Sequence, residues 1–174
     1  MGVVKRLAPV LLTVLLMSGC TDDEGDPVAE KLSQNAALQE RPTLEQEQAR
    51  LTAVRDQVRD ALASRTGLTA WSERDNGNAA GCADYPESDG YTAFLPSLLL
   101  AGGVSDQQWA EAVKVVEAVA GVSGFGPAEV VVDRPGQHQI VLSGERESRL
   151  SFGTTKNATL RLEAGCHLPE RDHS

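Results

Sequence analysis

The chain has 174 residues, and its 25 acidic side chains outnumber its 16 basic ones, which leaves a formal net charge of −9. An acidic surface is repelled by phosphate backbones and by anionic lipid headgroups, so the composition argues against nucleic-acid binding and against adhesion to membranes through surface charge. The length suits one compact domain with a short additional segment.

The first twenty residues have the form of an export signal that ends at a cysteine. Lys5 and Arg6 precede an apolar stretch that runs from Leu7 to Met17. A helix of about 11 residues rises only about 16 Å, roughly half the hydrocarbon thickness of a bilayer. A basic region, a short apolar region and small residues in this order are typical of a secretory signal.

The end of this segment, Met17-Ser18-Gly19-Cys20, resembles the lipobox of bacterial lipoproteins. The resemblance implies that the Cys20 sulfur receives a diacylglycerol and that residues 1–19 are removed just before it. That family usually has leucine where this chain has Met17. We therefore expect a protein bound to the extracytoplasmic face of the cell membrane through the lipid on Cys20. The alternatives are an ordinary signal peptide with an incidental cysteine, or a buried helix of a cytosolic protein.

The number of cysteines fits this interpretation. The chain has three, and lipidation of Cys20 leaves Cys82 and Cys166 as a pair in an oxidising compartment. A disulfide between them would close a loop of about 85 residues, which the chain-entropy model credits with roughly 4–5 kcal/mol. The alternative is two buried free thiols. The sequence has no C-x-x-C motif that would indicate redox catalysis.

Residues 20–42 are polar, acidic and nearly free of large apolar side chains. Such a composition buries too little surface to offset the entropy of ordering. We expect a flexible acidic tether that holds the domain away from the membrane, with a reach of roughly 25 Å.

A first amphipathic helix is predicted to begin at Thr43, because Thr43 and Gln46 have the spacing of a capping box. Gly67 supplies its C-terminal stop. The apolar positions fall on one face at 3.6 residues per turn: Leu44, Leu51, Val54, Val58, Ala61 and Leu62.

A second amphipathic helix is predicted after Ser105, which has the same relationship to Gln108, and it ends near Gly121 and Gly124. Its apolar stripe consists of Trp109, Ala112, Val113, Val116, Val119 and Ala120. Trp109 and Trp71 are interpreted as core anchors rather than as a binding face.

The remaining segments predict strands. In the last one, Ala158, Leu160, Leu162, Ala164 and Cys166 alternate with polar residues, which is typical of an antiparallel strand with one covered face and would place Cys166 on the core side. Residues 130–132 and 139–142 flank a type II turn at Pro135-Gly136. Another strand surrounds Leu150 and Phe152, and weaker ones are expected at 68–73 and 95–101.

These elements predict an α+β fold, a two-layer sandwich in which two amphipathic helices pack on one face of an antiparallel sheet of about four to six strands. We expect a single domain over residues 43–168, followed by a frayed tail at 169–174. A long loop at 74–91 carries Cys82 in its middle. Such loops are often functional or tied down, so this one is either fastened by the disulfide or binds a ligand.

The order and spacing of these features resemble the LppA-like lipoproteins of mycobacteria and related actinobacteria. Beside the lipobox, the features are Ala49–Ala53 in the first helix, Trp71, Cys82, the helix start at Ser105-Asp106, and the last strand at 157–165 running into Cys166. The resemblance spans roughly residues 44–168. It implies an envelope-facing lipoprotein with a disulfide of the family's type and no assigned activity.

The sequence contains no motif that specifies a reaction, a metal or a cofactor. The histidines are His138, His167 and His173, and Cys166 would be lost as a metal ligand by pairing with Cys82. The acidic side chains of the 74–91 loop match no EF-hand spacing. Gly121-Val122-Ser123-Gly124 falls short of G-x-S-x-G. We therefore expect no catalytic residues, no metal site and no cofactor.

Three functions follow as hypotheses. The first is a non-enzymatic envelope module that binds an unidentified envelope protein or polymer. The second is a carrier of a small apolar or lipid ligand, which requires a cavity of several hundred Å³ between helices and sheet. The third is an envelope hydrolase, which requires a cleft with acids or histidine of shifted pKa.

Overall fold

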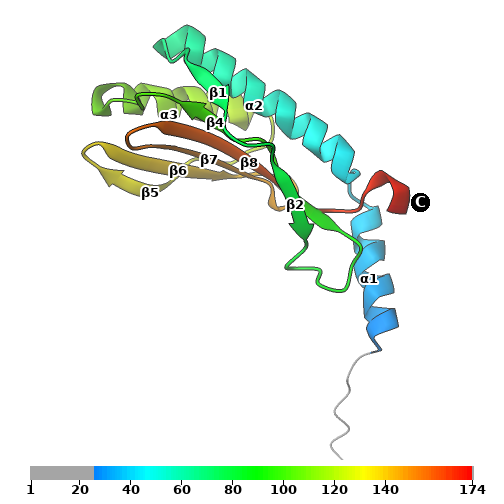
Figure 1. The fold of residues 1–174 in the computed structure, drawn as a ribbon. Helices are drawn as coiled ribbons and strands as arrows, with labels where there is room; N and C mark the ends of the chain where they lie inside the picture. Colours follow the sequence, from blue (N-terminus) through cyan, green and yellow to red (C-terminus); the bar gives the residue numbers. More distant parts are fainter. Residues whose placement is uncertain (1–25, 174) are drawn as a thin grey trace, which may run out of the picture.

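The computed structural model describes residues 26–173 (Figure 1). The predicted signal peptide at 1–19 and the lipidation site at Cys20 lie outside this range. The helices are α1 (Pro27–Gln39), α2 (Leu44–Thr66) and α3 (Asp106–Gly121), with short 3-10 turns η1 (Glu145–Glu147) and η2 (Glu170–Asp172). The strands are β1 (Trp71–Glu73), β2 (Asn78–Gly81), β3 (Tyr91–Phe94), β4 (Leu98–Leu100), β5 (Glu129–Arg134), β6 (Gln137–Ser143), β7 (Arg149–Thr154) and β8 (Ala158–His167).

The strands form one antiparallel sheet in the order β1-β4-β8-β7-β6-β5, with β2 and β3 joined to it through β8. Helices α2 and α3 lie over one face of this sheet, and no helix covers the other face in the described range (Figure 1). The mixed class, with helices on one face of an antiparallel sheet, agrees with the prediction. The sheet has eight strands among the described residues, however, which is more than the four to six predicted.

The additional strands are β2 and β3, which lie between the predicted strands at 68–73 and 95–101. Strands β3 and β4 follow one another along the same edge of β8, where Phe94 pairs with Glu163 and Leu98 pairs with Leu160. Proline has no N–H for the ladder, so one continuous strand is not possible there. Strand β2, inside the predicted 74–91 loop, has four exposed residues and therefore no apolar alternation that would mark it in the sequence.

The two long helices begin and end where their sequences predict. The Thr43 side chain accepts a hydrogen bond from the Gln46 amide, and the Gln46 side chain accepts one from the Thr43 amide, which completes the capping box. Gly67 ends α2 in the left-handed conformation with φ 75°. Ser105 caps α3.

The core fills the space between helices and sheet. Trp109 of α3 stacks on Phe152 of β7 with ring centroids 5.0 Å apart, as expected for a core anchor. Other large side chains that are fully buried in this layer are Leu51, Leu62, Ile140, Leu142 and Leu160. The space in which a carrier would hold an apolar ligand is therefore occupied by packed side chains. An open hollow of about 310 Å³ at the margin between α3 and β5 comes nearest to such a cavity.

The segment predicted as a flexible tether contains helix α1. Asp26 accepts a hydrogen bond from the Val28 amide and Pro27 occupies the first turn, which together start the helix. Leu38 at its other end is fully buried. Packing against the domain supplies the stabilisation that the composition of this segment does not predict. The prediction of a flexible chain over 20–42 is therefore wrong for 27–39.

The C-terminal segment, predicted as frayed from 169 to 174, is also fastened to the domain up to His173. The Glu170 amide donates to the Glu45 carboxylate at 2.9 Å, and the ring Nε2 of His173 lies 2.8 Å from the Arg41 carbonyl oxygen. Leu168 is fully buried beside Leu38. Contacts made by residues distant in sequence order this tail, which is why its composition did not predict them.

A bulge in β8 changes the side on which Cys166 lies. Thr92 pairs with Cys166, whereas Phe94 pairs with Glu163, so β8 has one extra residue between the two pairs. The extra residue reverses the alternation, and Cys166 lies on the face of Glu163 rather than with Ala164. The prediction that Cys166 faces the main core is therefore wrong: it belongs to a second buried cluster with Cys82, Leu38 and Leu168.

Candidate binding groove on the uncovered face of the sheet

The uncovered face carries a row of polar side chains that crosses the sheet. Arg161 of β8 lies directly opposite Ser151 of β7. Ser97 precedes the pair formed by Leu98 and Leu160, so it stands beside Arg161 in the next strand. Arg74 adjoins this row, because its amide donates to the Ser97 carbonyl oxygen at 2.8 Å. The ladder therefore brings two arginines that are far apart in the sequence into one row.

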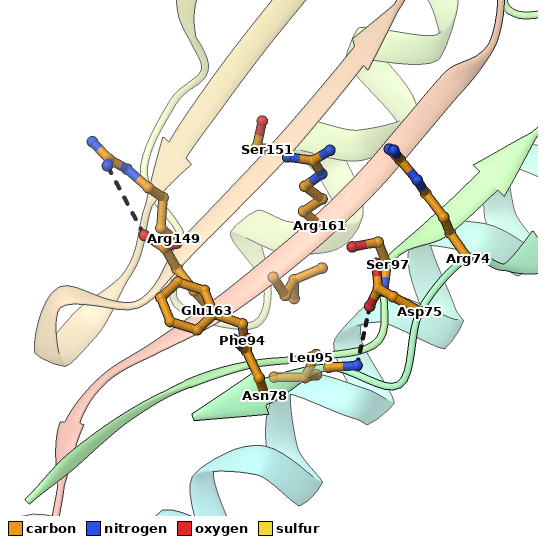
Figure 2. A pocket seen from close by; sticks show the side chains of 12 residues that line it. Arg74, Asp75, Asn78, Phe94, Leu95, Ser97, Arg149, Ser151, Arg161 and Glu163 are labelled. Carbon is orange, nitrogen blue, oxygen red and sulfur yellow. Dashed lines mark hydrogen bonds and ion pairs between the residues drawn. The ribbon is translucent and has the colours of Figure 1, made fainter. Parts of the chain in front are cut away.

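A groove of about 730 Å³ opens on this face. Figure 2 shows the guanidinium groups of Arg74 and Arg161 at one side of it and the ring of Phe94 at another. Phe94 is 38% exposed. The charged and aromatic side chains that line the groove are Arg74, Asp75, Phe94, Arg149, Arg161 and Glu163.

A second hollow of about 310 Å³ adjoins the groove. Arg74, Ser151 and Arg161 line both, so these three residues stand between the two hollows. The second hollow contains no acidic side chain. Its further lining consists mostly of hydroxyl and amide groups, among them Gln139, Thr155, Asn157 and Thr159.

The two acids of the groove are already engaged by other partners. Glu163 lies 3.9 Å from the Arg149 guanidinium. The Asp75 carboxylate accepts hydrogen bonds from the Gly77 amide at 3.0 Å and from the Ser97 amide at 3.1 Å. Hydrogen bonds from Ser97, and then from the Gly77 amide, lower the pKa of Asp75 and keep it ionised in this orientation.

Because the acids of the groove bind other groups, Arg74 and Arg161 have no carboxylate partner there. Both are exposed, and neither guanidinium makes an ion pair or a hydrogen bond with any residue of the described range. Several arginines elsewhere in the domain are engaged; for example, Arg50 binds Glu47 at 2.6 Å, and Arg59 binds Asp60 at 2.8 Å. In a chain with an excess of acids, two unpaired guanidinium groups in one groove form a local anion-binding surface.

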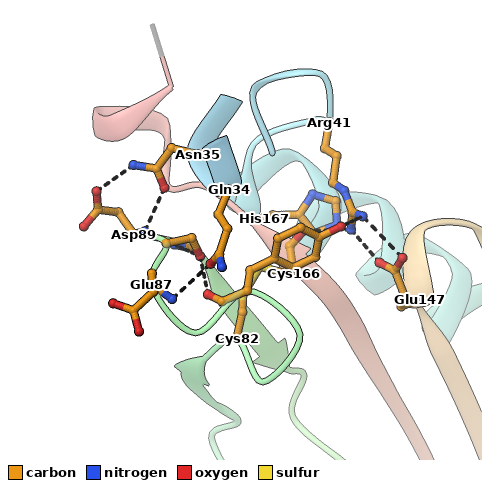
Figure 3. Close-up of a disulfide and its surroundings, with 12 residues drawn as sticks. Gln34, Asn35, Arg41, Cys82, Glu87, Asp89, Glu147, Cys166 and His167 are labelled. Atoms are coloured by element: carbon orange, nitrogen blue, oxygen red, sulfur yellow. Dashed lines mark hydrogen bonds and ion pairs between the residues drawn. A yellow bond between two sulfur atoms is a disulfide. The ribbon is translucent and has the colours of Figure 1, made fainter. Parts of the chain in front are cut away.

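The disulfide between Cys82 and Cys166, expected from the cysteine count, is present, with Cα atoms 5.6 Å apart. Figure 3 shows the loop around it held from two sides. On one side, Asn35 of α1 binds both the Asp89 side chain and the Asp89 amide at 2.9 Å. On the other, the Arg41 guanidinium binds the Tyr85 hydroxyl at 2.8 Å and also binds Glu147.

This arrangement answers the question about the 74–91 loop. Its second half is fastened by the disulfide and by α1, whereas its first half, with Arg74, Asp75 and Asn78, lines the groove. The interpretation as a fastened loop is confirmed for the second half, and ligand binding stays a prediction for the first half.

The three histidines have different hydrogen-bond partners. His138 stands between the Asp106 and Asp133 carboxylates, at 3.0 and 2.8 Å. His167 is fully buried, and its Nδ1 donates to the Pro42 carbonyl oxygen at 2.8 Å. Within residues 26–173, no group of three or more His, Cys, Asp or Glu side chains is placed to hold a metal ion.

Sequence reasoning did not single out the groove arginines. The alternation of β8 does place Arg161 on the polar face, so the position of one of the two arginines could be predicted from the sequence. The position of Arg74 depends on a backbone contact with Ser97, more than twenty residues away, and no local pattern indicates it.

Comparison with known proteins decides the family. A family model described as "LppA: Lipoprotein confined to pathogenic Mycobacterium" matches residues 21–170 of the chain. The chain belongs to the LppA family of lipoproteins. A search of curated proteins finds no match.

Two solved structures share the fold of this LppA family member. The crystal structure of LppA from Mycobacterium tuberculosis has a TM-score of 0.70 and 19% sequence identity, and the match covers 84% of this chain and 91% of the other. A DUF4853 family protein from Actinomyces odontolyticus has a TM-score of 0.56 and 15% identity, covering 75% of this chain and 72% of the other. At these identities the likeness concerns the fold.

As a member of a lipoprotein family, the protein has a family-level association with the cell envelope. Among the helices described for residues 26–173, none combines the length and the apolar character needed to cross a bilayer.

Proposed function

We propose that this LppA family member is a lipid-anchored binding module without catalytic activity, held at the extracytoplasmic face of the cell membrane through Cys20. The uncovered face of its sheet binds an envelope component. The observation that carries the proposal is the groove in which the guanidinium groups of Arg74 and Arg161 make no ion pair and no hydrogen bond with the described residues.

The anchor is supported by the family and by the sequence. The family is one of lipoproteins, and Met17–Cys20 has the form of a lipobox. One acyl chain binds a membrane only reversibly, whereas the two or three chains of a processed lipoprotein hold it stably. The net charge of −9 opposes a general attraction to anionic headgroups, so attachment depends on the lipid.

A binding role is favoured over hydrolysis by the chemistry of the groove. A hydrolase needs a nucleophile or a general base beside a stabiliser of developing charge. The groove offers guanidinium groups as stabilisers, but its acids are held by Arg149 and by backbone amides. His138 borders the smaller hollow, but both nitrogens of its ring contact carboxylates, those of Asp133 and Asp106.

The anchor is tested by the mass of the mature N-terminal peptide isolated from native cells. The expected peptide begins at Cys20 and carries a diacylglycerol, with or without an additional acyl chain. A Cys20→Ser variant is expected to leave the membrane fraction. An unmodified peptide that begins upstream of Cys20 would remove this part of the proposal.

The binding role is tested by a photo-reactive diazirine amino acid introduced into the full-length protein in native cells. At position 94 it lies in the groove, and at position 122 it replaces an 86% exposed valine at the end of α3 as a matched control. A discrete crosslinked product is expected from position 94 alone, and it should be lost with Arg161→Gln. Equal products from both positions, or none from position 94, would contradict the proposal.

A further inference from the structure

We propose that Arg74 and Arg161 hold the phosphate of a phosphorylated sugar, with the hydroxyl-rich part of the ligand lying along the groove. The inference rests on the proposed binding role of this face and names its ligand class. It has three parts: a place for an anion, polar surfaces on both sides of it, and an exposed aromatic ring.

The place for the anion follows from the ladder. Arg74 and Arg161 stand in one cross-strand row with Ser97 between them, so their backbones are separated by about 10 Å, twice the spacing of adjacent strands. Long side chains from such positions can converge on one group. Figure 2 shows both guanidinium groups at the same side of the groove, with that of Arg161 beside Ser151. The planar fork of arginine matches the oxygens of phosphate, and two forks suit a group of double charge.

The neighbouring surfaces favour a hydroxylated ligand. On one side of the arginine pair, the smaller hollow presents hydroxyl and amide side chains, including Gln139, Asn157 and Thr159. Such groups donate and accept hydrogen bonds, as sugar hydroxyls require of a partner. On the other side, Phe94 offers a flat apolar ring that is 38% exposed. Sugar rings can pack on aromatic faces of this kind.

The same surfaces argue against an acidic peptide as the occupant. A peptide bound in an open groove gains specificity by burying alternate side chains in pockets. The aliphatic residues in the lining, Leu95 and Leu162, are themselves buried and present little surface. Phe94 is the exposed apolar side chain of the groove, so the surface is suited to a polar ligand.

The test is a titration of full-length lipidated protein in polyoxyethylene detergent micelles, which contain neither sugar nor phosphate. The probes are glucose 6-phosphate and orthophosphate, both followed by phosphorus NMR, glucose followed by saturation transfer, and hexaglutamate as a competitor. Glucose 6-phosphate is expected to bind at least about 10-fold more tightly than orthophosphate or glucose. Hexaglutamate is expected not to displace it.

Four variants locate the binding. Arg74→Gln and Arg161→Gln should each weaken glucose 6-phosphate binding by about 10-fold or more, because each removes a charge-assisted pair. Arg65→Gln, which removes the same charge from an exposed position at the end of α2, should leave binding unchanged. Phe94→Ala should weaken the binding of glucose 6-phosphate and leave the binding of orthophosphate unchanged. Unchanged melting temperatures would show that the variants fold.

Several results would overturn the inference. Equal affinity for orthophosphate and glucose 6-phosphate would show that the sugar contributes nothing to binding. Tighter binding of hexaglutamate would show that the groove takes an acidic peptide instead of a sugar phosphate. Absence of binding by any probe would remove the anion site. If crosslinking from position 94 persists in that case, the binding role of the face stands and only the ligand class fails. If that crosslinking is also lost, both proposals fail.

Discussion

The imidazole ring of His138 stacks on the indole of Trp109, with ring centroids 5.1 Å apart and planes 18° from parallel. Trp109 in turn stacks on Phe152, so the histidine forms the outer end of a row of three rings that begins in the core. Its two nitrogens meet Asp106 of α3 and Asp133 of β5. One side chain thus connects the start of a helix with the edge of the sheet.

Protonation of His138 should stabilise the fold. Both nitrogens face carboxylates, which accept hydrogen bonds, so the charged ring satisfies both contacts. The hydrogen bond with Asp106, followed by the one with Asp133, raises the pKa of His138 above its ordinary 6.5. The folded state therefore keeps a proton that the unfolded state releases above pH 6.5, and stability is lost as pH rises through the raised pKa, with a slope of at most about 1.4 kcal/mol per pH unit.

Chemical denaturation between pH 6 and 9 measures this slope. His138→Gln is expected to remove the fall in unfolding free energy. Asp133→Asn keeps the imidazole but removes one carboxylate, so its slope should be intermediate. If the unfolding free energy of His138→Gln falls with pH as steeply as that of the wild type, the effect belongs to another group.

His167 should have the opposite effect on the acid side. Burial lowers the pKa of His167 below its ordinary 6.5, and Nε2 has no hydrogen-bond partner in the described range. The folded state therefore excludes a proton that the unfolded state binds, and stability should fall as pH decreases below 6.5. Together the two histidines predict a stability maximum near pH 6.5. Unfolding of His167→Asn between pH 5 and 6.5 should lack the histidine component of this loss, and an unaltered curve would contradict the assignment.

Gly165 lies where η1 crosses the bulge of β8. A Cβ atom at this position would stand 1.8 Å from the Arg146 carbonyl oxygen, which belongs to the backbone and cannot be moved cheaply. Gly165→Ala is therefore expected to lower the unfolding free energy by about 2 kcal/mol. At Gly81 no atom lies within 4 Å of such a Cβ, so Gly81→Ala should change stability by less than about 0.5 kcal/mol. Equal effects of the two substitutions, measured by urea denaturation, would contradict this account of the bulge.

The disulfide is expected to stabilise both the domain and helix α1. Cys82 and Cys166 are separated by 84 residues, and they pack with Leu38 of α1. Replacing both by alanine should lower the unfolding free energy by about 4–5 kcal/mol, as closure of a loop of this length predicts. Reduced wild-type protein should match the double variant in denaturation experiments.

Hydrogen exchange separates the local effect from the global one. Loss of the disulfide should increase exchange in α1 before it does so in α2, because α1 is held by Leu38 and by contacts with the loop around Asp89. Equal increases in both helices would show that α1 docks independently of the disulfide.

The elements that the sequence predicts well are those whose signals are local. Helices α2 and α3 have an amphipathic stripe of 3.6-residue period and a capping residue, and β8 has a period of two, so each pattern reports its own structure. The turn at Pro135-Gly136 follows in the same way, with Gly136 at φ 71° between β5 and β6. The pairing of Cys82 with Cys166 needed only a count.

The elements it misses are those that other parts of the chain create. Helix α1 is stabilised because Leu38 packs against the disulfide and Leu168. Strand β2 forms because it pairs with β3. The face of Cys166 was mispredicted because one bulge residue reverses the alternation, and bulges leave no periodic signal.

By itself, the sequence determined the lipoprotein family resemblance, the two covering helices, the polar face of β8 and the cysteine pair, because these depend on residue type and short-range periodicity. Only the tertiary structure decided that Arg74 joins Arg161 on the uncovered face and that the nearby acids are engaged elsewhere. Cross-strand neighbours are set by the register between distant segments, and that register comes from the packing of the whole sheet.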